Sequence, residues 1–181
     1  MKRRDLHRLA LSMALSAWVG VGPVQAAGRR PGGPLWQGFP FALGVASGQP
    51  RPDSVVLWTR LVFAEADMAL QRQAQTVRCE VFADEALRQP VRDWLIETDA
   101  RRGHSVHVIA TGLQPGRSYW YRFSCGSVQS AVGRTRTSPA EGERVERLRI
   151  GQASCQHFEQ GYYVAHREMA QRDLDFVLFV G

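Results

Sequence analysis

The chain has 181 residues, of which 44% are hydrophobic and 22% charged, and its formal net charge at pH 7 is +6. This length is enough for one or two domains and for a sizeable buried core. Half of the net positive charge lies in residues 1–26. No run of Lys and Arg interleaved with aromatic residues follows, so we expect no nucleic-acid binding.

Residues 1–26 have the pattern of a signal peptide: a basic start, an apolar stretch over Leu9–Gly22, and small residues before a cleavage point after Ala26. The apolar stretch is shorter than the roughly 20 residues that a spanning helix needs, so no transmembrane segment is expected after cleavage. Arg3 and Arg4 are adjacent, which favours the twin-arginine export route over an ordinary secretory signal that happens to carry two arginines. We therefore expect a periplasmic or extracellular protein whose partners include the twin-arginine export machinery.

Residues 27–40 are rich in Gly and Pro and predict a loose leader. From residue 41 the sequence pattern changes to short β-like runs separated by turn residues. Seven such runs predict an all-β sandwich over residues 41–137: 41–47, 54–61, 77–83, 93–98, 104–111, 118–125 and 129–137. Alternation is clearest in two of them, where one face carries Val77, Cys79 and Val81 in the first and Tyr119, Tyr121, Phe123 and Cys125 in the second.

The segment "TGLQPGRSYWYRF" contains the pattern L-x-P-G-x-x-Y, from Leu113 to Tyr119. The Pro-Gly pair predicts a turn, and the Tyr119 hydroxyl can bond back to the backbone upstream, forming a tyrosine corner. This corner resembles the one in fibronectin type III domains, and we expect a sandwich of that type rather than an unrelated β-domain with a chance turn.

Three cysteines, at positions 79, 125 and 155, leave at least one without a disulfide partner. Cys79 and Cys125 are predicted to face inward. A disulfide between neighbouring strands of one sheet is strained, so we favour two buried free thiols over a bridge.

After a charged linker over residues 138–146, residues 147–181 predict a strand, a helix and a second strand. The helical spacing involves Tyr162, Ala165 and Met169. About 20 residues separate the strands, which predicts a parallel βαβ unit. A single unit cannot close a core, so we expect the rest of an α/β domain to lie beyond this chain.

In open α/β sheets, ligands bind beyond the carboxyl ends of the strands. The first strand of this unit ends at "ASCQ", which places Ser154, Cys155 and Gln156 at that edge, with His157 on the loop that follows. A thiol there can be a metal ligand, a nucleophile or only a small apolar filler. His166 lies mid-helix, where packing or solvent exposure is common. Asp173 and Asp175 precede the second strand, so we expect them at the opposite edge, as a helix stop and a turn.

The segments "FALGVASGQPRPDSVVLWTRL" and "RIGQASCQHFEQGYYVAHREMAQRDLDFVLFVG" resemble the PhoD-type alkaline phosphatase/phosphodiesterase family. The resemblance implies twin-arginine export and a β-sandwich ahead of a metallophosphoesterase domain with an iron and calcium centre. It implies that Cys155 ligates the iron, with Gln156 and His157 close to the site. In the family the second strand continues from the glycine at Gly181 to Asp and Tyr ligands.

The resemblance therefore predicts the amino-terminal part of an exported enzyme that hydrolyses phosphate esters with a metal-activated water. No catalytic residue is assigned within this chain, and the chain alone is expected to be inactive. Two alternatives remain open: a secreted, non-catalytic β-sandwich binding module, and a metallophosphoesterase of the purple acid phosphatase type. Cys155 argues against the latter.

Overall fold

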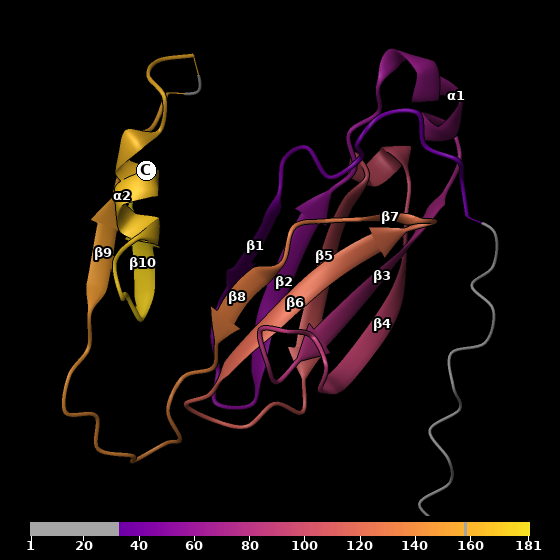
Figure 1. Cartoon of the computed structure of the whole chain (residues 1–181). Coiled ribbons are helices and arrows are strands. Elements are labelled where there is room, and N and C mark those ends of the chain that lie inside the picture. Colours follow the sequence, from indigo (N-terminus) through magenta and orange to yellow (C-terminus); the bar gives the residue numbers. More distant parts are fainter. Residues whose placement is uncertain (1–32, 158) are drawn as a thin grey trace, which may run out of the picture. The chain divides into compact units, whose positions relative to one another are not determined.

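The computed structural model describes residues 33–157 and 159–181 (Figure 1). The predicted signal peptide, with Arg3 and Arg4, lies outside the described residues. The described chain is mostly β-structure. Its first part is a two-sheet β-sandwich, as predicted, and its last part is a two-stranded parallel sheet with one helix.

One sheet of the sandwich has three antiparallel strands: β1 (Val45–Gly48), β2 (Ser54–Arg60) and β5 (Ser105–Thr111). Strand β2 is central, with β1 on one side and β5 on the other. Val55 and Leu57 of β2 and Val106 and Val108 of β5 are buried, whereas the residues between them face outward. This period of two is why one side of the sheet can form a core.

The second sheet contains β3 (Gln75–Phe82), β4 (Pro90–Thr98), β6 (Ser118–Cys125), β7 (Val128–Gln129) and β8 (Gly133–Arg136). Its order is β4-β3-β6, and both β7 and β8 pair with β6. The run predicted as a single strand over residues 129–137 is therefore interrupted. Ser130 lies at the break, where its hydroxyl accepts from the Phe123 N–H at 2.9 Å and replaces a ladder bond.

The core lies between the two sheets, and the two predicted inward faces are confirmed. Val77, Cys79 and Val81 of β3 are fully buried, as are Phe123 and Cys125 of β6. Tyr121 packs against Phe123 with ring centroids 6.1 Å apart and nearly perpendicular planes, an arrangement that aromatic pairs favour. Full burial of a Val or Phe side chain such as Val77 or Phe123 contributes roughly 1.5–3 kcal/mol to folding.

The tyrosine corner is also confirmed. The Tyr119 hydroxyl accepts a hydrogen bond from the backbone N–H of Gln114 at 2.8 Å, and Leu113 at the start of the turn is buried. The Leu113 N–H in turn donates to the Asp53 carbonyl at 3.0 Å. The turn between β5 and β6 is thereby joined to the segment that precedes β2.

Residues 33–40, the described part of the leader predicted over residues 27–40, pack against the sandwich. Pro40 is buried and Trp36 packs against the core. The buried carboxylate of Asp67 accepts from the backbone N–H groups of Gln37 and Gly38, both at 2.8 Å. The packed part of the sandwich therefore begins before residue 41, because a side chain about thirty residues later holds the leader's backbone.

Three short helical elements occur in the loops of the sandwich: η1 (Glu65–Asp67), α1 (Met68–Gln71) and η2 (Ala100–Arg102). Their main consequence is to place Asp67 beneath the leader and to position Gln71. The carbonyl of Gln71 bonds to Nε2 of the buried His104 at 2.8 Å.

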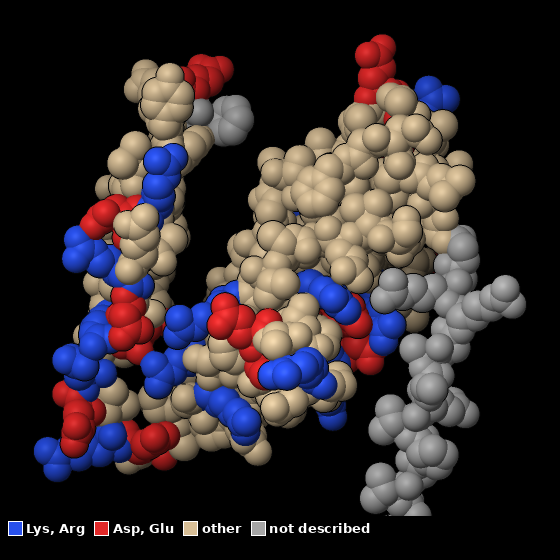
Figure 2. All heavy atoms as spheres, in the orientation of Figure 1, with Lys and Arg blue, Asp and Glu red and all other residues tan. Residues whose placement is uncertain are grey.

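Opposite charges are paired on the outer side of the β4-β3-β6 sheet. Arg78 pairs with Asp93 at 2.9 Å, and Arg122 pairs with Glu80 at the same distance. Figure 2 shows Arg, Asp and Glu side chains interspersed at the lower end of the sandwich rather than segregated by sign. The Arg78–Asp93 pair is the more exposed of the two, and exposed pairs contribute little to stability.

The last part of the chain forms β9 (Ile150–Ala153), α2 (Val164–Ala170) and β10 (Phe176–Phe179). Strands β9 and β10 are parallel, in register from Ile150–Phe176 to Ala153–Phe179, so the predicted βαβ arrangement is confirmed. The helix begins at Val164, so Tyr162 of the predicted helical spacing lies outside it, and the half-buried residues of α2 are Met169, as predicted, and His166 rather than Ala165. The i, i+3 pair faces the strands.

Candidate metal-ligand site at the carboxyl ends of β9 and β10

The candidate site lies where the two parallel strands end. The Val180 N–H donates to the Ala153 carbonyl at 3.0 Å, so the chains leaving β9 and β10 remain side by side for one further residue. The next residues are Ser154 and Cys155 after β9 and Gly181 after β10. Parallel strands bring their carboxyl ends to one edge of the sheet, which is the edge where α/β proteins bind ligands.

Cys155 is exposed, and its backbone has a φ of +47°. This is the left-handed region, which costs a non-glycine residue roughly 1–3 kcal/mol and persists only when the surroundings hold it. The thiol points to Gly181: a Cβ added at Gly181 would lie 2.9 Å from Cys155 Sγ and 3.1 Å from its backbone nitrogen. The absence of a side chain at position 181 is what allows the second strand end to approach the thiol.

Gln156 and His157 follow Cys155 on the same loop, and both are exposed. His157 Nδ1 accepts from the Glu159 N–H at 3.3 Å, and its carbonyl accepts from the Gln160 N–H at 3.3 Å. The imidazole of His157 thus takes part in a local turn of its own loop. His157 follows the end of β9, as predicted. A role for it in binding a ligand stays a prediction.

Sequence reasoning missed the contact between His166 and this loop. Nε2 of His166, on α2, bonds to Oε1 of Gln156. The ring of His166 also packs against Tyr163 and Phe179, with centroid distances of 5.9 and 5.7 Å. The spacing to Met169 was the only available signal, and it did not single out His166, because Ala165 (i, i+4) and His166 (i, i+3) fit it equally well.

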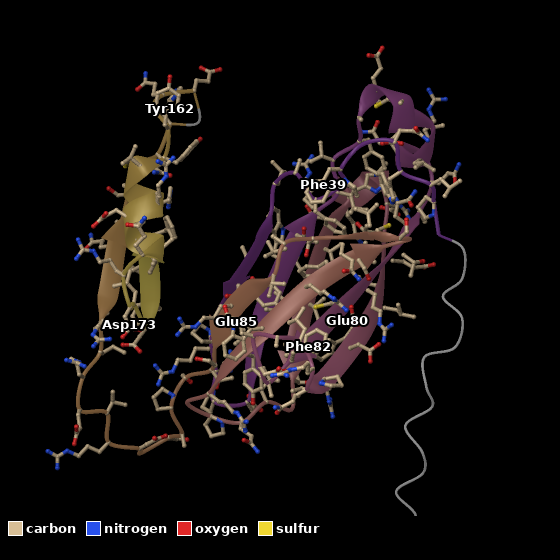
Figure 3. The ribbon with its side chains drawn as sticks, in the orientation of Figure 1. Phe39, Glu80, Phe82, Glu85, Tyr162 and Asp173 are labelled. Atoms are coloured by element: carbon tan, nitrogen blue, oxygen red, sulfur yellow. The ribbon has the colours of Figure 1, made fainter. Side chains whose placement is uncertain are left out.

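Asp173 and Asp175 lie at the opposite edge, as predicted. Figure 3 shows Asp173 at the other end of this segment from Tyr162, which belongs to the loop between Cys155 and α2. Asp173 pairs with the Arg149 side chain, and Asp175 accepts from the Arg149 backbone N–H at 2.8 Å. Both carboxylates are engaged where β9 begins, away from Cys155.

Within residues 33–157 and 159–181, no three His, Cys, Asp or Glu side chains converge in a way that could hold a metal ion. Cys155 can supply one thiolate ligand, which suits iron. Calcium takes about six to eight oxygen ligands, and the loop that carries the thiol offers the Gln156 amide oxygen as one of them. Cys155 therefore fits as one ligand of iron, and the described residues do not complete a site for either metal.

The other two cysteines lie in the sandwich core and are free thiols, as favoured. Burial raises the pKa of Cys79 from 9.0 to about 12, with a further contribution from the Glu80 and Asp93 carboxylates. Burial raises the pKa of Cys125 to about 11. Thiolates are the reactive form, so these two cysteines are chemically inert compared with the exposed Cys155.

No helix within the described residues is both long and apolar enough to cross a membrane. This finding concerns residues 33–157 and 159–181, and the predicted signal peptide lies outside them.

Known proteins match the chain in both of its parts. Residues 29–139 match the model of the PhoD-like phosphatase N-terminal domain, and residues 150–181 match the PhoD-like phosphatase model. Alkaline phosphatase D from Bacillus subtilis (strain 168) is 42% identical over 174 residues, which cover 96% of this chain and 29% of that protein. The chain therefore spans less than a third of this relative.

One solved structure agrees with the sequence matches. A structure of PhoD superimposes with a TM-score of 0.75 at 44% identity, over 82% of this chain and 28% of that one. The sensor domain of the anti-sigma factor RsgI4 from Pseudobacteroides cellulosolvens gives a TM-score of only 0.42 at 9% identity, over 52% of this chain and 74% of that domain, too low to bear on the fold. The N-terminal domain model alone accounts for more than half of the residues, and the chain belongs to the PhoD-like phosphatase family.

Proposed function

We propose that this chain is the amino-terminal part of an exported, metal-dependent hydrolase of phosphate esters, and that Cys155 is one ligand of its iron. The observation that carries the proposal is the position of Cys155: an exposed thiol at the carboxyl end of β9, against the end of β10. A thiolate suits iron, and the carboxyl edge of a parallel sheet is where such ligands converge.

The remaining iron ligands, and most ligands of calcium, would come from outside the described residues, since no further ligand cluster occurs within them. A bound metal centre supplies a nucleophilic hydroxide and neutralises charge on the phosphoryl oxygens. The residues described here would contribute the thiolate and the shape of one wall of the site. Substrate preference would be decided by residues elsewhere.

The proposed export rests on Arg3 and Arg4 and on the apolar stretch that follows them. Replacing both arginines with lysine preserves the charge but removes the paired-arginine signal. We expect a reporter fused after the leader to stay in the cytoplasm with the lysine variant and to reach the periplasm with the unchanged leader. Equal export of both would favour an ordinary secretory signal.

The enzymatic proposal is tested in a polypeptide that continues this chain to the length of its relatives, which we call the extended protein. The expected result is bound iron together with hydrolysis of p-nitrophenyl phosphate or bis(p-nitrophenyl) phosphate, and none by residues 27–181 alone. The two substrates separate monoesterase from diesterase activity. An extended protein without metal or hydrolysis would favour the non-catalytic module instead.

A further inference from the structure

We infer that His166 is a positioning residue: through Gln156 it holds the backbone of Cys155 in the conformation that presents its thiol at the strand ends. The inference deepens the proposed function, since it concerns the residue proposed to bind iron. Its physical content is a contact between helix α2 and the loop after β9, and that contact can be tested with no metal present.

The contact has a defined direction. In this orientation of the Gln156 amide, Oε1 faces the ring and can only accept, so the bond takes the His166 tautomer that carries its proton on Nε2. The ring that carries this donor is held by two aromatic neighbours, one on each side of it in sequence. Tyr163 precedes α2 and Phe179 ends β10, with ring planes tilted by 35° and 30° from that of His166. The imidazole is therefore oriented before it meets Gln156.

Gln156 is adjacent to the strained residue. Cys155 has a φ of +47°, which an L-residue leaves unless its neighbours prevent it. On one side the main chain of Gly181 lies against the Cys155 thiol and backbone nitrogen. On the other side the peptide leads to Gln156, whose side chain is bound by His166. One contact therefore reaches Cys155 from the neighbouring strand end, and the other acts on the residue that follows it in the chain.

The packing of helix α2 against the strands does not require the contact between His166 and Gln156. Met169 shares the strand-facing side of α2 with His166, and its sulfur lies over Gly151 in the middle of β9. Met169 accounts for the attachment of the helix to the strands. His166 reaches instead to the loop beyond the strand, so its removal should alter the loop while leaving the helix in place.

The experiment measures the rate at which 5,5′-dithiobis(2-nitrobenzoate) reacts with the folded chain in the presence of EDTA. Cys79 and Cys125 have 0% exposure, so the rate reports Cys155. His166→Phe keeps an aromatic ring but removes the donor, and Gln156→Ala removes the acceptor. Each should raise the rate about fivefold, the factor expected for one lost hydrogen bond that restrains the thiol. The double variant should react no faster than either single variant.

His166→Gln retains an N–H donor and should restore most of the unchanged chain's rate. Met169→Leu is the matched control on the same helix face, and it should leave the rate within twofold. Circular dichroism and amide exchange of residues 164–170 check that α2 persists in each variant. If α2 is lost in His166→Phe, the rate of Gln156→Ala alone tests the inference, because this substitution changes no residue of the helix.

Rates within twofold of the unchanged chain for both single variants would overturn the inference, as would multiplicative effects in the double variant. Because the assay contains no metal, its outcome is independent of whether the extended protein binds iron. Failure of the proposed function and failure of this inference are therefore distinguishable.

Discussion

Gly181 lies against Cys155 so closely that a methyl group at position 181 would come within 2.9 Å of the thiol sulfur. The two residues are 26 positions apart in sequence, and parallel pairing of β9 and β10 brings them together. A thiol is thus placed next to the backbone of the neighbouring strand end.

This relationship predicts the effect of Gly181→Ala in the extended protein. The added methyl group must push the Cys155 thiol or its backbone aside, because contacts under 3.0 Å are not tolerated. We expect iron content, measured by plasma mass spectrometry, to fall several-fold while the sandwich melts unchanged. Gly48→Ala, where a Cβ meets nothing within 4 Å, is the control. Full iron occupancy in Gly181→Ala would show that the contact does not constrain the site.

Gly133→Ala should destabilise the sandwich. A Cβ at Gly133 would lie 2.3 Å from Tyr121 Cζ, and Tyr121 is almost fully buried, so its ring has no room to withdraw. Overpacking of this kind costs roughly 1–3 kcal/mol in the free energy of unfolding. Urea denaturation followed by tryptophan fluorescence measures the loss. Gly48→Ala should change stability by less than about 1 kcal/mol, and equal midpoints for both variants would contradict the prediction.

Tyr119→Phe tests the tyrosine corner. The change removes the hydroxyl that accepts from the Gln114 N–H and leaves the ring in place. We expect a loss of about 1 kcal/mol in unfolding free energy, the usual value for one hydrogen bond. Tyr162→Phe, at a side chain with 89% exposure, should be neutral. A corner variant as stable as the unchanged protein would mean that water or another acceptor satisfies the Gln114 N–H.

The buried thiols and Tyr121 predict a loss of stability at alkaline pH. Burial raises the pKa of Cys79 to about 12, of Cys125 to about 11 and of Tyr121 to about 12. As the pH rises from 9 toward 12, these groups lose protons in the unfolded chain before they do so in the folded one. The folded state then binds more protons, so the free energy of unfolding falls through this window and is fully retained below it.

Cys79→Ala separates the contribution of the Cys79 thiol to this pH dependence from the contributions of Cys125 and Tyr121. The variant loses a small buried side chain and starts from lower stability, but its free energy of unfolding should fall less steeply between pH 9 and 12. Parallel curves for the variant and the unchanged protein would show that Cys79 does not titrate in that window. In the folded protein at neutral pH, only Cys155 should react with a thiol reagent.

The alternation of apolar residues made much of the sandwich predictable. In β3 and β6 every second residue is apolar, and burial of Val77, Val81 and Phe123 follows directly from that period. The corner at Tyr119 was predictable because its donor lies only five residues away. The packed leader was not, since the contact of Asp67 with Gln37 spans thirty residues and leaves no local pattern.

The edge of the sheet at which the candidate site lies was predictable from the sequence. Cys155 could be placed at a strand end from the alternating residues 147–153 before it, and Gly181 from the apolar run over residues 176–180. The link from His166 to Gln156 could not be predicted, because a seven-residue helix has too few residues to show which of its sides faces the strands. Ala165 and His166 are neighbours, and the spacing to Met169 fits either of them.

The central claim is that Cys155 is a ligand of iron, and the most direct test is the iron content of the extended protein with Cys155→Ala. Plasma mass spectrometry should find iron in the unchanged protein and little in this variant, with phosphate-ester hydrolysis lost in parallel. Cys79→Ala, which removes a buried thiol, should keep both iron and activity. Undiminished iron and full hydrolysis in Cys155→Ala would contradict the account.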